Sequence, residues 1–113
     1  MSLKIWLDGQ LVEKENAKLS VYDHGALYGD GVFEGIRAYN GRIFECEAHV
    51  RRFWDSARAI RLQIPYTPEQ FTAAMNETVK ANNLTDCYIR AVCTRGPGDL
   101  GIDPRKSPRP LRL

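Results

Sequence analysis

The fold of this chain is decided by residues 31–44, which read GVFEGIRAYNGRIF. Residues 31–39 form one extended arm, and Arg42-Ile43-Phe44 forms the returning arm. Between them, Asn40-Gly41 supplies the two positive φ angles that a type I′ turn requires. This stretch therefore predicts a β-hairpin within an antiparallel sheet.

Residues 28–37, YGDGVFEGIR, overlap the first arm and carry the most informative composition in the chain. Three glycines alternate with aromatic, acidic and basic side chains, where a purely structural strand would carry more β-branched residues. Glycine lets a backbone come close to a ligand, so the run indicates the wall of a small-molecule site. The alternative is a glycine-bearing strand with a bulge. A dinucleotide loop is excluded, because its three glycines have another spacing and lead into a helix.

The other elements follow from turn and capping signals. Residues 4–12 read as a hairpin around Asp8-Gly9, and residues 18–31 as a short strand and a turn. A helix is predicted over 46–62. Its buried face comprises Val50, Phe53, Trp54, Ala57, Ile60 and Arg61.

A second helix begins after Thr67, which is followed by proline at N1 and by Gln70 at the capping-box position. Its predicted buried residues are Phe71, Ala74, Met75, Thr78 and Val79. Asn82-Asn83 can end it in the left-handed region, and residues 87–94 form a strand. This order predicts the α+β class, an antiparallel sheet with two packed helices.

Composition narrows the classes of function. The 113 residues carry a net charge of +2, which gives no case for nucleic acid, and no apolar run approaches the ~20 residues that span a membrane. The three cysteines lack Cys-x-x-Cys spacing, so we expect reduced thiols in a cytoplasm. His24 and His49 have no metal-ligand spacing, so no metal site is predicted.

Two parts of the sequence, the pair Tyr88 and Arg90 and the single residue Arg52, have residue types that suit anionic ligands. Tyr88 and Arg90 are two apart on a predicted strand and share a face, where a guanidinium beside a phenol could receive a carboxylate. The alternative is an exposed strand face that happens to carry both. Arg52 falls nearly opposite the apolar stripe of its helix, so periodicity alone places it in solvent.

Residues 23–37, DHGALYGDGVFEGIR, resemble the start of the fold-type IV pyridoxal-phosphate enzymes, and FEGIR is most like the branched-chain amino acid aminotransferases. The likeness continues in His49-x-x-Arg52-Phe53, in NNL before Tyr88-Ile89-Arg90, and in Arg95-Gly96 followed by GDLG. It implies the N-terminal domain of the D-amino-acid-aminotransferase-like fold over residues 1–94. Residues 95–113 would then be an interdomain loop and the start of a C-terminal domain.

The resemblance also implies a cofactor, a reaction and a set of site residues. The cofactor is pyridoxal 5'-phosphate, and Arg52 matches the arginine that binds its phosphate. Five positions match the substrate pocket: Tyr28, Phe33, Gly35, Tyr88 and Arg90. Arg90 and Tyr88 would lie near the α-carboxylate, and Gly35 would leave room for substrate. Tyr28 would serve the site of a neighbouring subunit, because the family works as dimers or larger assemblies.

The implied reaction is the transfer of the amino group of leucine, isoleucine or valine to 2-oxoglutarate, forming glutamate. The lysine that forms the Schiff base is expected downstream, because none of Lys4, Lys14, Lys18, Lys80 and Lys106 matches it. The chain alone is therefore predicted to hold no catalytic residue and to be inactive. D-amino acid aminotransferases and aminodeoxychorismate lyases share the architecture and remain alternatives, as does a non-catalytic binding module.

Overall fold

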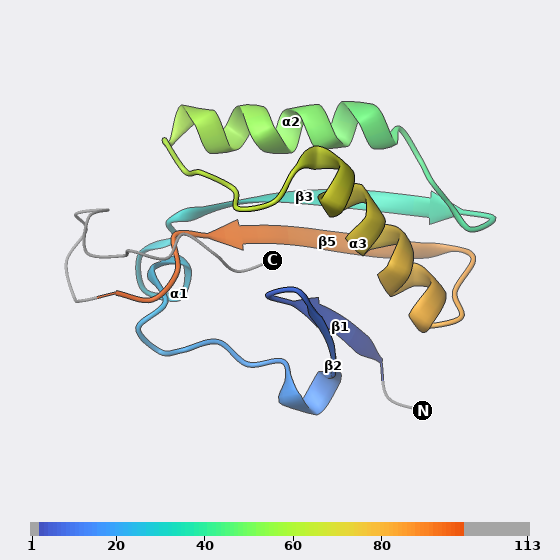
Figure 1. The fold of residues 1–113 in the computed structure, drawn as a ribbon, viewed down its shortest axis with the longest axis horizontal. Helices are drawn as coiled ribbons and strands as arrows, with labels where there is room; N and C mark the ends of the chain where they lie inside the picture. The colour runs from blue at the N-terminus through green and yellow to red at the C-terminus, as the bar shows by residue number, and fades with distance from the viewer. Residues whose placement is uncertain (1–2, 99–113) are drawn as a thin grey trace.

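A three-stranded antiparallel sheet forms the centre of the computed structural model, which describes residues 3–98 (Figure 1). Its order is β4-β3-β5, with β3 at Gly31–Tyr39, β4 at Arg42–Ile43 and β5 at Cys87–Thr94. The predicted hairpin is confirmed, since Asn40 and Gly41 have φ angles of 52° and 77° between β3 and β4. β3 pairs with β5 along almost its whole length, from Gly31 opposite Thr94 to Ala38 opposite Cys87.

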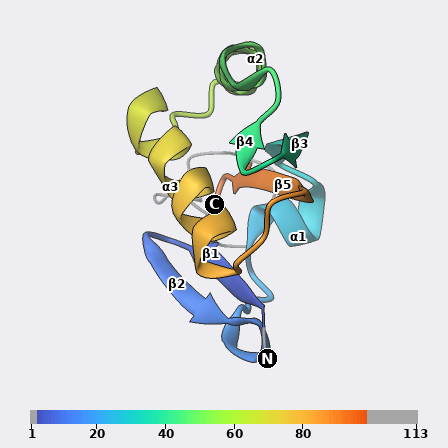
Figure 2. The same cartoon turned by 90° about the vertical axis from the view of Figure 1, so that its right-hand side faces the viewer.

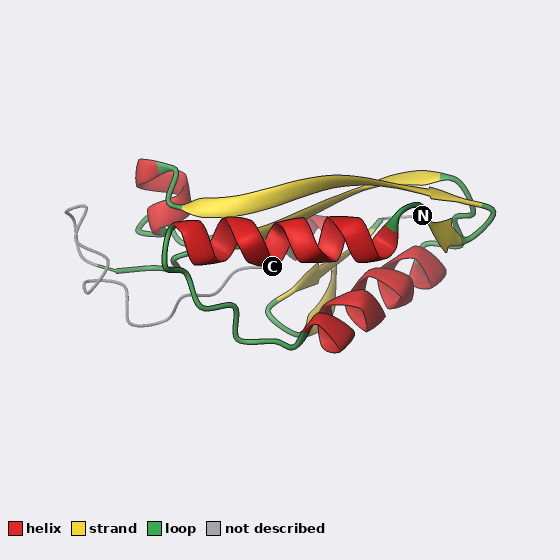
Figure 3. Cartoon of the chain, turned by 90° about the horizontal axis from the view of Figure 1, so that it is seen from above, coloured by secondary structure: helices red, strands yellow, loops and turns green. Residues whose placement is uncertain are grey.

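Two long helices cover one face of this sheet. α2 (Cys46–Ala59) runs above β3 in Figure 1, and α3 (Pro68–Ala81) crosses beside it, as Figure 3 shows from above. Phe53 from α2 stacks on Phe71 from α3 with ring centroids 4.6 Å apart, and Ile36 of β3 belongs to the same buried cluster. The predicted α+β class with two packed helices is confirmed.

α2 ends three residues before the predicted Leu62. Ile60 caps the helix, and Arg61 adopts a left-handed φ of 56°, which turns the chain so that Leu62 enters the core. The prediction that Ile60 and Arg61 belong to the buried face is therefore wrong, because both are exposed. α3 has the predicted capping box between Thr67 and Gln70 and ends before Asn83, whose φ is 54°.

The predicted short strand within residues 18–31 is wrong. A short helix, α1 (His24–Tyr28), lies there instead, because Asp23 caps its first turn by accepting from the Gly25 N–H at 2.8 Å. Gly29 closes it with a φ of 67°, a left-handed angle that glycine adopts without strain. Both signals are visible in the sequence.

The remaining elements lie beyond β5 and beside α3, at the end of the molecule away from α2, as Figures 1 and 2 show. The predicted first hairpin is confirmed as β1 (Lys4–Leu7) and β2 (Gln10–Glu13), followed by a 3-10 turn, η1, at Lys14–Asn16. β1 packs on α3 through Asn82, whose side chain hydrogen-bonds both the N–H and the C=O of Lys4. No helix within residues 3–98 is long and apolar enough to cross a membrane.

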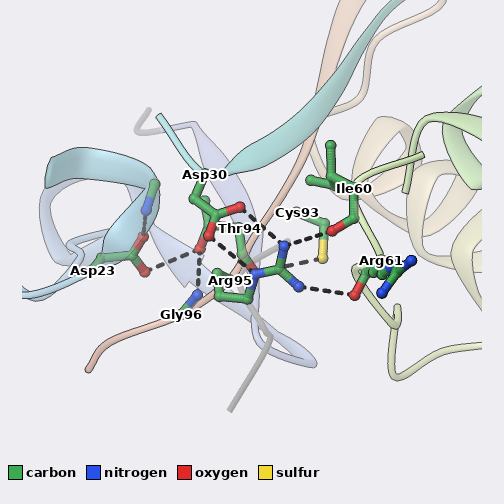
Figure 4. Close-up of polar contacts among 9 residues, drawn as sticks. Asp23, Asp30, Ile60, Arg61, Cys93, Thr94, Arg95 and Gly96 are labelled. Carbon is green, nitrogen blue, oxygen red and sulfur yellow. Dashed lines mark hydrogen bonds and ion pairs between the residues drawn. The ribbon is translucent and has the colours of Figure 1, made fainter. Parts of the chain in front are cut away.

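A buried arginine ties three segments together at one end of the sheet (Figure 4). Arg95, which follows β5, donates two hydrogen bonds to the carboxylate of Asp30, at 3.0 and 3.2 Å. Its backbone N–H donates to the carbonyl oxygen of Asp30 at 2.9 Å. Its guanidinium also donates to the carbonyl oxygens of Ile60 and Arg61, at 2.8 and 2.9 Å. The guanidinium thus provides donors for two carbonyl oxygens that follow the last turn of α2. The termination of α2 before Leu62 therefore depends on Arg95, 34 positions after Arg61.

Candidate cofactor and substrate site

Side chains that alternate along β3 divide the predicted site residues between the two faces of the sheet. Val32, Glu34 and Ile36 are buried and point toward α2. The odd-numbered positions Phe33 and Gly35 point to the opposite, uncovered face. Arg90 lies directly opposite Gly35 in register, so it occupies that uncovered face as well.

The uncovered face gathers four of the five predicted substrate residues, namely Phe33, Gly35, Tyr88 and Arg90. Tyr88 and Arg90 share this face, as their spacing predicted. The side chains of Phe33 and Tyr88 are 56% and 54% exposed, which leaves both rings available to a ligand.

Two arginines on this face lie over aromatic rings. The guanidinium carbon of Arg90 is 4.2 Å from the centroid of the Phe33 ring, and that of Arg37 is 5.6 Å from the centroid of Tyr88. Neither guanidinium forms an ion pair within residues 3–98. A carboxylate could therefore bind either one without displacing a protein carboxylate. Sequence reasoning missed Arg37, although its position two residues after Gly35 places it on the same face.

Gly35 makes room for a protein side chain. A Cβ atom at this position would lie 2.4 Å from the Tyr88 hydroxyl and 3.1 Å from two ring carbons of Tyr88. The ring of Tyr88 thus crosses β3 over Gly35, where no side chain stands in its way. Any space that Gly35 leaves for substrate is space next to this ring.

Tyr28 stands apart from these four residues, on α1. Its ring meets the buried ring of His24 edge-on, with centroids 5.1 Å apart, and the residue is 40% exposed. α1 packs on the uncovered side of the sheet, since a Cβ on Gly25 would meet Thr94 of β5 at 2.3 Å. The structure therefore places Tyr28 near the end of the uncovered face where β3 begins.

Arg52 lies on α2, across the sheet from the substrate residues. Its Nε and Nη2 donate to the two carboxylate oxygens of Glu34, at 2.9 and 2.7 Å. The Arg52 side chain is 65% exposed, whereas that of Glu34 is only 7% exposed. Periodicity correctly placed Arg52 at the surface, but it did not reveal that a buried carboxylate holds this side chain.

His49 completes this cluster. Its Nδ1 lies 2.8 Å from Oε1 of Glu34. An ionised carboxylate can only accept, so Nδ1 carries the proton of this hydrogen bond. Sequence reasoning missed Glu34 and His49; an acidic residue between the apolar Val32 and Ile36 on a predicted strand is the signal that would have revealed the cluster.

The cluster keeps Glu34 ionised. Hydrogen bonds from Arg52, and next from His49, lower the pKa of the Glu34 carboxyl below 4.5, although burial acts in the opposite direction. The same contact with Glu34 raises the pKa of Arg52. Both groups are therefore charged at neutral pH.

One edge of β3 lies between the Arg52–Glu34–His49 cluster and the substrate residues on the uncovered face. β4 pairs only with Ala38 and Tyr39, so residues 31–37 have no strand beside this edge within the described part of the chain. The carbonyl of Arg37 points there and accepts from the Phe44 N–H at 2.8 Å. A molecule lying along this edge could contact Arg52 on one side of the sheet and Phe33 and Arg90, on the uncovered face, on the other.

The donor chemistry of Arg52 fits a phosphate group. Glu34 engages Nε and Nη2, and Nη1 makes no hydrogen bond within residues 3–98, so one end of an exposed guanidinium is left for an anion. The described residues contain no group of three or more side chains suited to a metal ion.

A cavity of about 340 Å³ lies between β1, α3 and β5. It is bordered by Tyr88 and Arg90 but not by Phe33, Gly35 or Arg52. Its walls are mainly the apolar side chains of β1 and α3, including Trp6 and Met75. It is thus distinct from the edge of β3 where the two sets of site residues approach each other.

Comparison of the sequence with known protein families identifies the class of protein to which this chain belongs. Residues 31–112 match the family model of amino-transferase class IV. The chain belongs to this family.

Particular relatives narrow the resemblance. A protein of Methanocaldococcus jannaschii assigned to the branched-chain-amino-acid aminotransferases is 54% identical over 108 residues, which are 96% of this chain and 38% of that protein. A D-alanine aminotransferase of Staphylococcus haemolyticus is 38% identical over 93 residues, 82% of this chain and 33% of that enzyme.

A solved structure shares the fold. The T.th. branched-chain amino acid aminotransferase, complexed with N-(5'-phosphopyridoxyl)-L-glutamate, superposes with a TM-score of 0.90 at 40% identity. The match covers 99% of this chain and 39% of that one. The predicted fold-type IV architecture is thereby confirmed, and the chain spans about two fifths of the length of these relatives.

Proposed function

We propose that this chain is part of a pyridoxal-phosphate-dependent branched-chain amino acid aminotransferase, which moves the amino group of leucine, isoleucine or valine to 2-oxoglutarate. One structural observation carries the proposal. Phe33, Tyr88 and Arg90 combine apolar rings with an arginine that has no carboxylate partner within residues 3–98, on a sheet face that α2 and α3 leave uncovered. A branched aliphatic amino acid offers the matching groups, a carboxylate and an apolar side chain.

The residues of this chain bind and orient. Arg52 would hold the cofactor phosphate through Nη1, which makes no hydrogen bond within residues 3–98, and Arg90 with Tyr88 would orient the substrate carboxylate. Phe33 offers an apolar surface to the branched side chain, where each methylene discriminates by about 1–3 kcal/mol. Pyridoxal phosphate, when bound, supplies the electrophilic carbon that takes the amino group and a ring that stabilises negative charge at the substrate Cα.

No lysine within residues 3–98 lies in the site. Lys4 pairs with Glu13 on the β1–β2 hairpin, whereas Lys14, Lys18 and Lys80 are exposed elsewhere. Lys106 is outside the described residues. Since none of the five lysines matches the Schiff-base lysine of the family, we infer that the group that moves the substrate proton comes from a longer polypeptide and that this chain by itself is inactive. We extend the proposal to a cytoplasmic homo-oligomer in which Tyr28 serves the site of a neighbouring subunit.

An amino-donor screen on the full-length protein tests the function. We expect glutamate to form from 2-oxoglutarate with L-leucine, L-isoleucine or L-valine, and no reaction with D-alanine. Activity with D-alanine but none with L-leucine would overturn the proposal in favour of the D-amino acid aminotransferase that the Staphylococcus relative supports. Conversion of aminodeoxychorismate alone would instead indicate the lyase.

The description of this chain as an incomplete enzyme has its own test. This chain is mixed with pyridoxal phosphate and reduced with borohydride, and its intact mass is measured. We expect little or scattered labelling, because no lysine among the described residues is placed at the site. Stoichiometric labelling of one lysine would mean that the chain carries its own cofactor lysine and that its description as an incomplete enzyme is wrong.

A further inference from the structure

The buried position of Glu34 needs an explanation other than stability. Glu34 lies on the core face of β3 between Val32 and Ile36, where its side chain is only 7% exposed. Removing a carboxylate from water costs free energy, and an apolar residue at such a place is often neutral or stabilising. The partner of Glu34 in the ion pair is the Arg52 side chain, which is 65% exposed. The ion pair therefore does not join two buried parts of the fold.

The contacts of Glu34 restrict one side chain in particular. β3 holds the backbone of Glu34 opposite Ala91, and His49 holds Oε1 from α2. The two carboxylate oxygens then bind two different nitrogens of Arg52, which fixes the plane of its guanidinium as well as its position. An exposed arginine would otherwise sample many rotamers, and binding an anion would require it to give them up.

From this geometry we propose that Glu34 is a positioning residue, which holds the Arg52 guanidinium with Nη1 directed toward the cofactor phosphate, and that His49 supports it by fixing the carboxylate. This inference rests on the proposed function, because it takes the phosphate to be the ligand of Arg52. It adds that affinity for the phosphate depends on a residue that does not contact it. The chemistry is an anion site whose cation is oriented in advance.

The test compares two cofactor forms in the full-length protein. Apoenzyme is titrated with pyridoxal phosphate and with pyridoxal, which lacks the phosphate, and binding is followed by fluorescence. We expect Glu34→Gln to weaken binding of pyridoxal phosphate about tenfold and to leave pyridoxal unchanged. Glu77→Gln, an exposed glutamate on α3, is the matched control and should alter neither.

Combining Glu34→Gln with Arg52→Ala distinguishes a positioning role of Glu34 from a general loss of structure. In an Arg52→Ala protein, Glu34→Gln should cause no further loss of affinity for pyridoxal phosphate, because Glu34 acts only through Arg52. Glu34→Asp keeps the charge but shortens the reach, so it should give an intermediate loss. If Glu34→Gln does not fold, Glu34→Asp still tests whether Glu34 positions Arg52.

Each outcome has a separate meaning. Unchanged affinity in both Glu34 variants, with a large loss in Arg52→Ala, would overturn the positioning role alone. Unchanged affinity in Arg52→Ala would overturn the phosphate assignment within the proposed function. Equal losses for pyridoxal and pyridoxal phosphate in Glu34→Gln would show a structural effect and also overturn the positioning role.

Discussion

On the side of the sheet that faces α2, Arg52 is hydrogen-bonded to the buried carboxylate of Glu34, whereas on the opposite side Arg37 and Arg90 lie over aromatic rings. The carboxylate fixes the orientation of a guanidinium through two bonds of defined direction. A ring attracts the cation over a broad surface and leaves all its N–H donors available. The first arrangement suits a ligand group that always binds in one place, as a cofactor phosphate does. The second suits substrates that differ in shape.

Arg95 is the extreme case of an arginine held by a carboxylate, so its removal has the largest expected effect. Arg95→Ala leaves the Asp30 carboxylate and two helix-end carbonyls without their donor, which should lower the free energy of unfolding by about 3–5 kcal/mol. Urea denaturation of the full-length protein measures this. Arg58→Ala, an exposed residue on α2, is the control and should cost under about 1 kcal/mol. Equal costs for the two variants would contradict the role given to Arg95.

Arg90 tests the face where rings hold the arginines. If the proposed function holds, Arg90→Ala should lower kcat/KM for leucine about 100-fold without changing the affinity for pyridoxal phosphate, because it would remove the proposed carboxylate donor and leave Arg52 intact. Steady-state kinetics and a cofactor titration on the full-length protein measure both quantities. A loss of affinity for pyridoxal phosphate in Arg90→Ala would contradict the assignment of cofactor binding to one face of the sheet and substrate binding to the other.

Gly35 provides a smaller change on the same face. Gly35→Ala places a methyl group 2.4 Å from the present position of the Tyr88 hydroxyl, so the ring must move outward. Because Tyr88 is 54% exposed, we expect little loss of stability but a reduction of about tenfold in kcat/KM. As a control, Gly35→Ala is also made in a Tyr88→Phe background and compared with Tyr88→Phe alone; only the contacts of 3.1 Å with two ring carbons remain there, so the reduction should be smaller. Unchanged kinetics in Gly35→Ala would show that the position of the Tyr88 ring is unimportant.

The smallest expected effect is a pH dependence of stability that arises from Glu34. Its folded-state pKa is lowered, so the unfolded state binds the proton more readily. The stabilisation is fully present above the unfolded pKa of about 4.5 and is lost as pH falls through the lower folded value. The difference in unfolding free energy between wild type and Glu34→Gln should therefore shrink as the pH falls from neutral through that range. A constant difference over the same range would contradict the shift.

Local signals explain why most elements were predictable. Asn40-Gly41 and the Thr67–Gln70 capping box act through backbone geometry within a few residues, and both were found where expected. The errors have two origins. The Asp23 cap and the Gly29 stop of α1 are local signals that the prediction of a short strand does not take into account, whereas the end of α2 at Ala59 is held by Arg95, far along the chain.

The sequence by itself determined the strand alternation and the turn chemistry, and with them the shared face of Tyr88 and Arg90 on their strand. The pairing of β5 with β3 then brings Phe33 and Gly35 to the same face of the sheet. Only the tertiary structure decided which partner each arginine has. Register across β3 and β5 brings Arg90 to Phe33, and packing of α2 on β3 brings Arg52 to Glu34, 18 residues earlier in the chain. The reason is physical: backbone preferences act between neighbours in sequence, whereas hydrogen bonds and cation–π contacts depend on distances that exist only after the elements have packed.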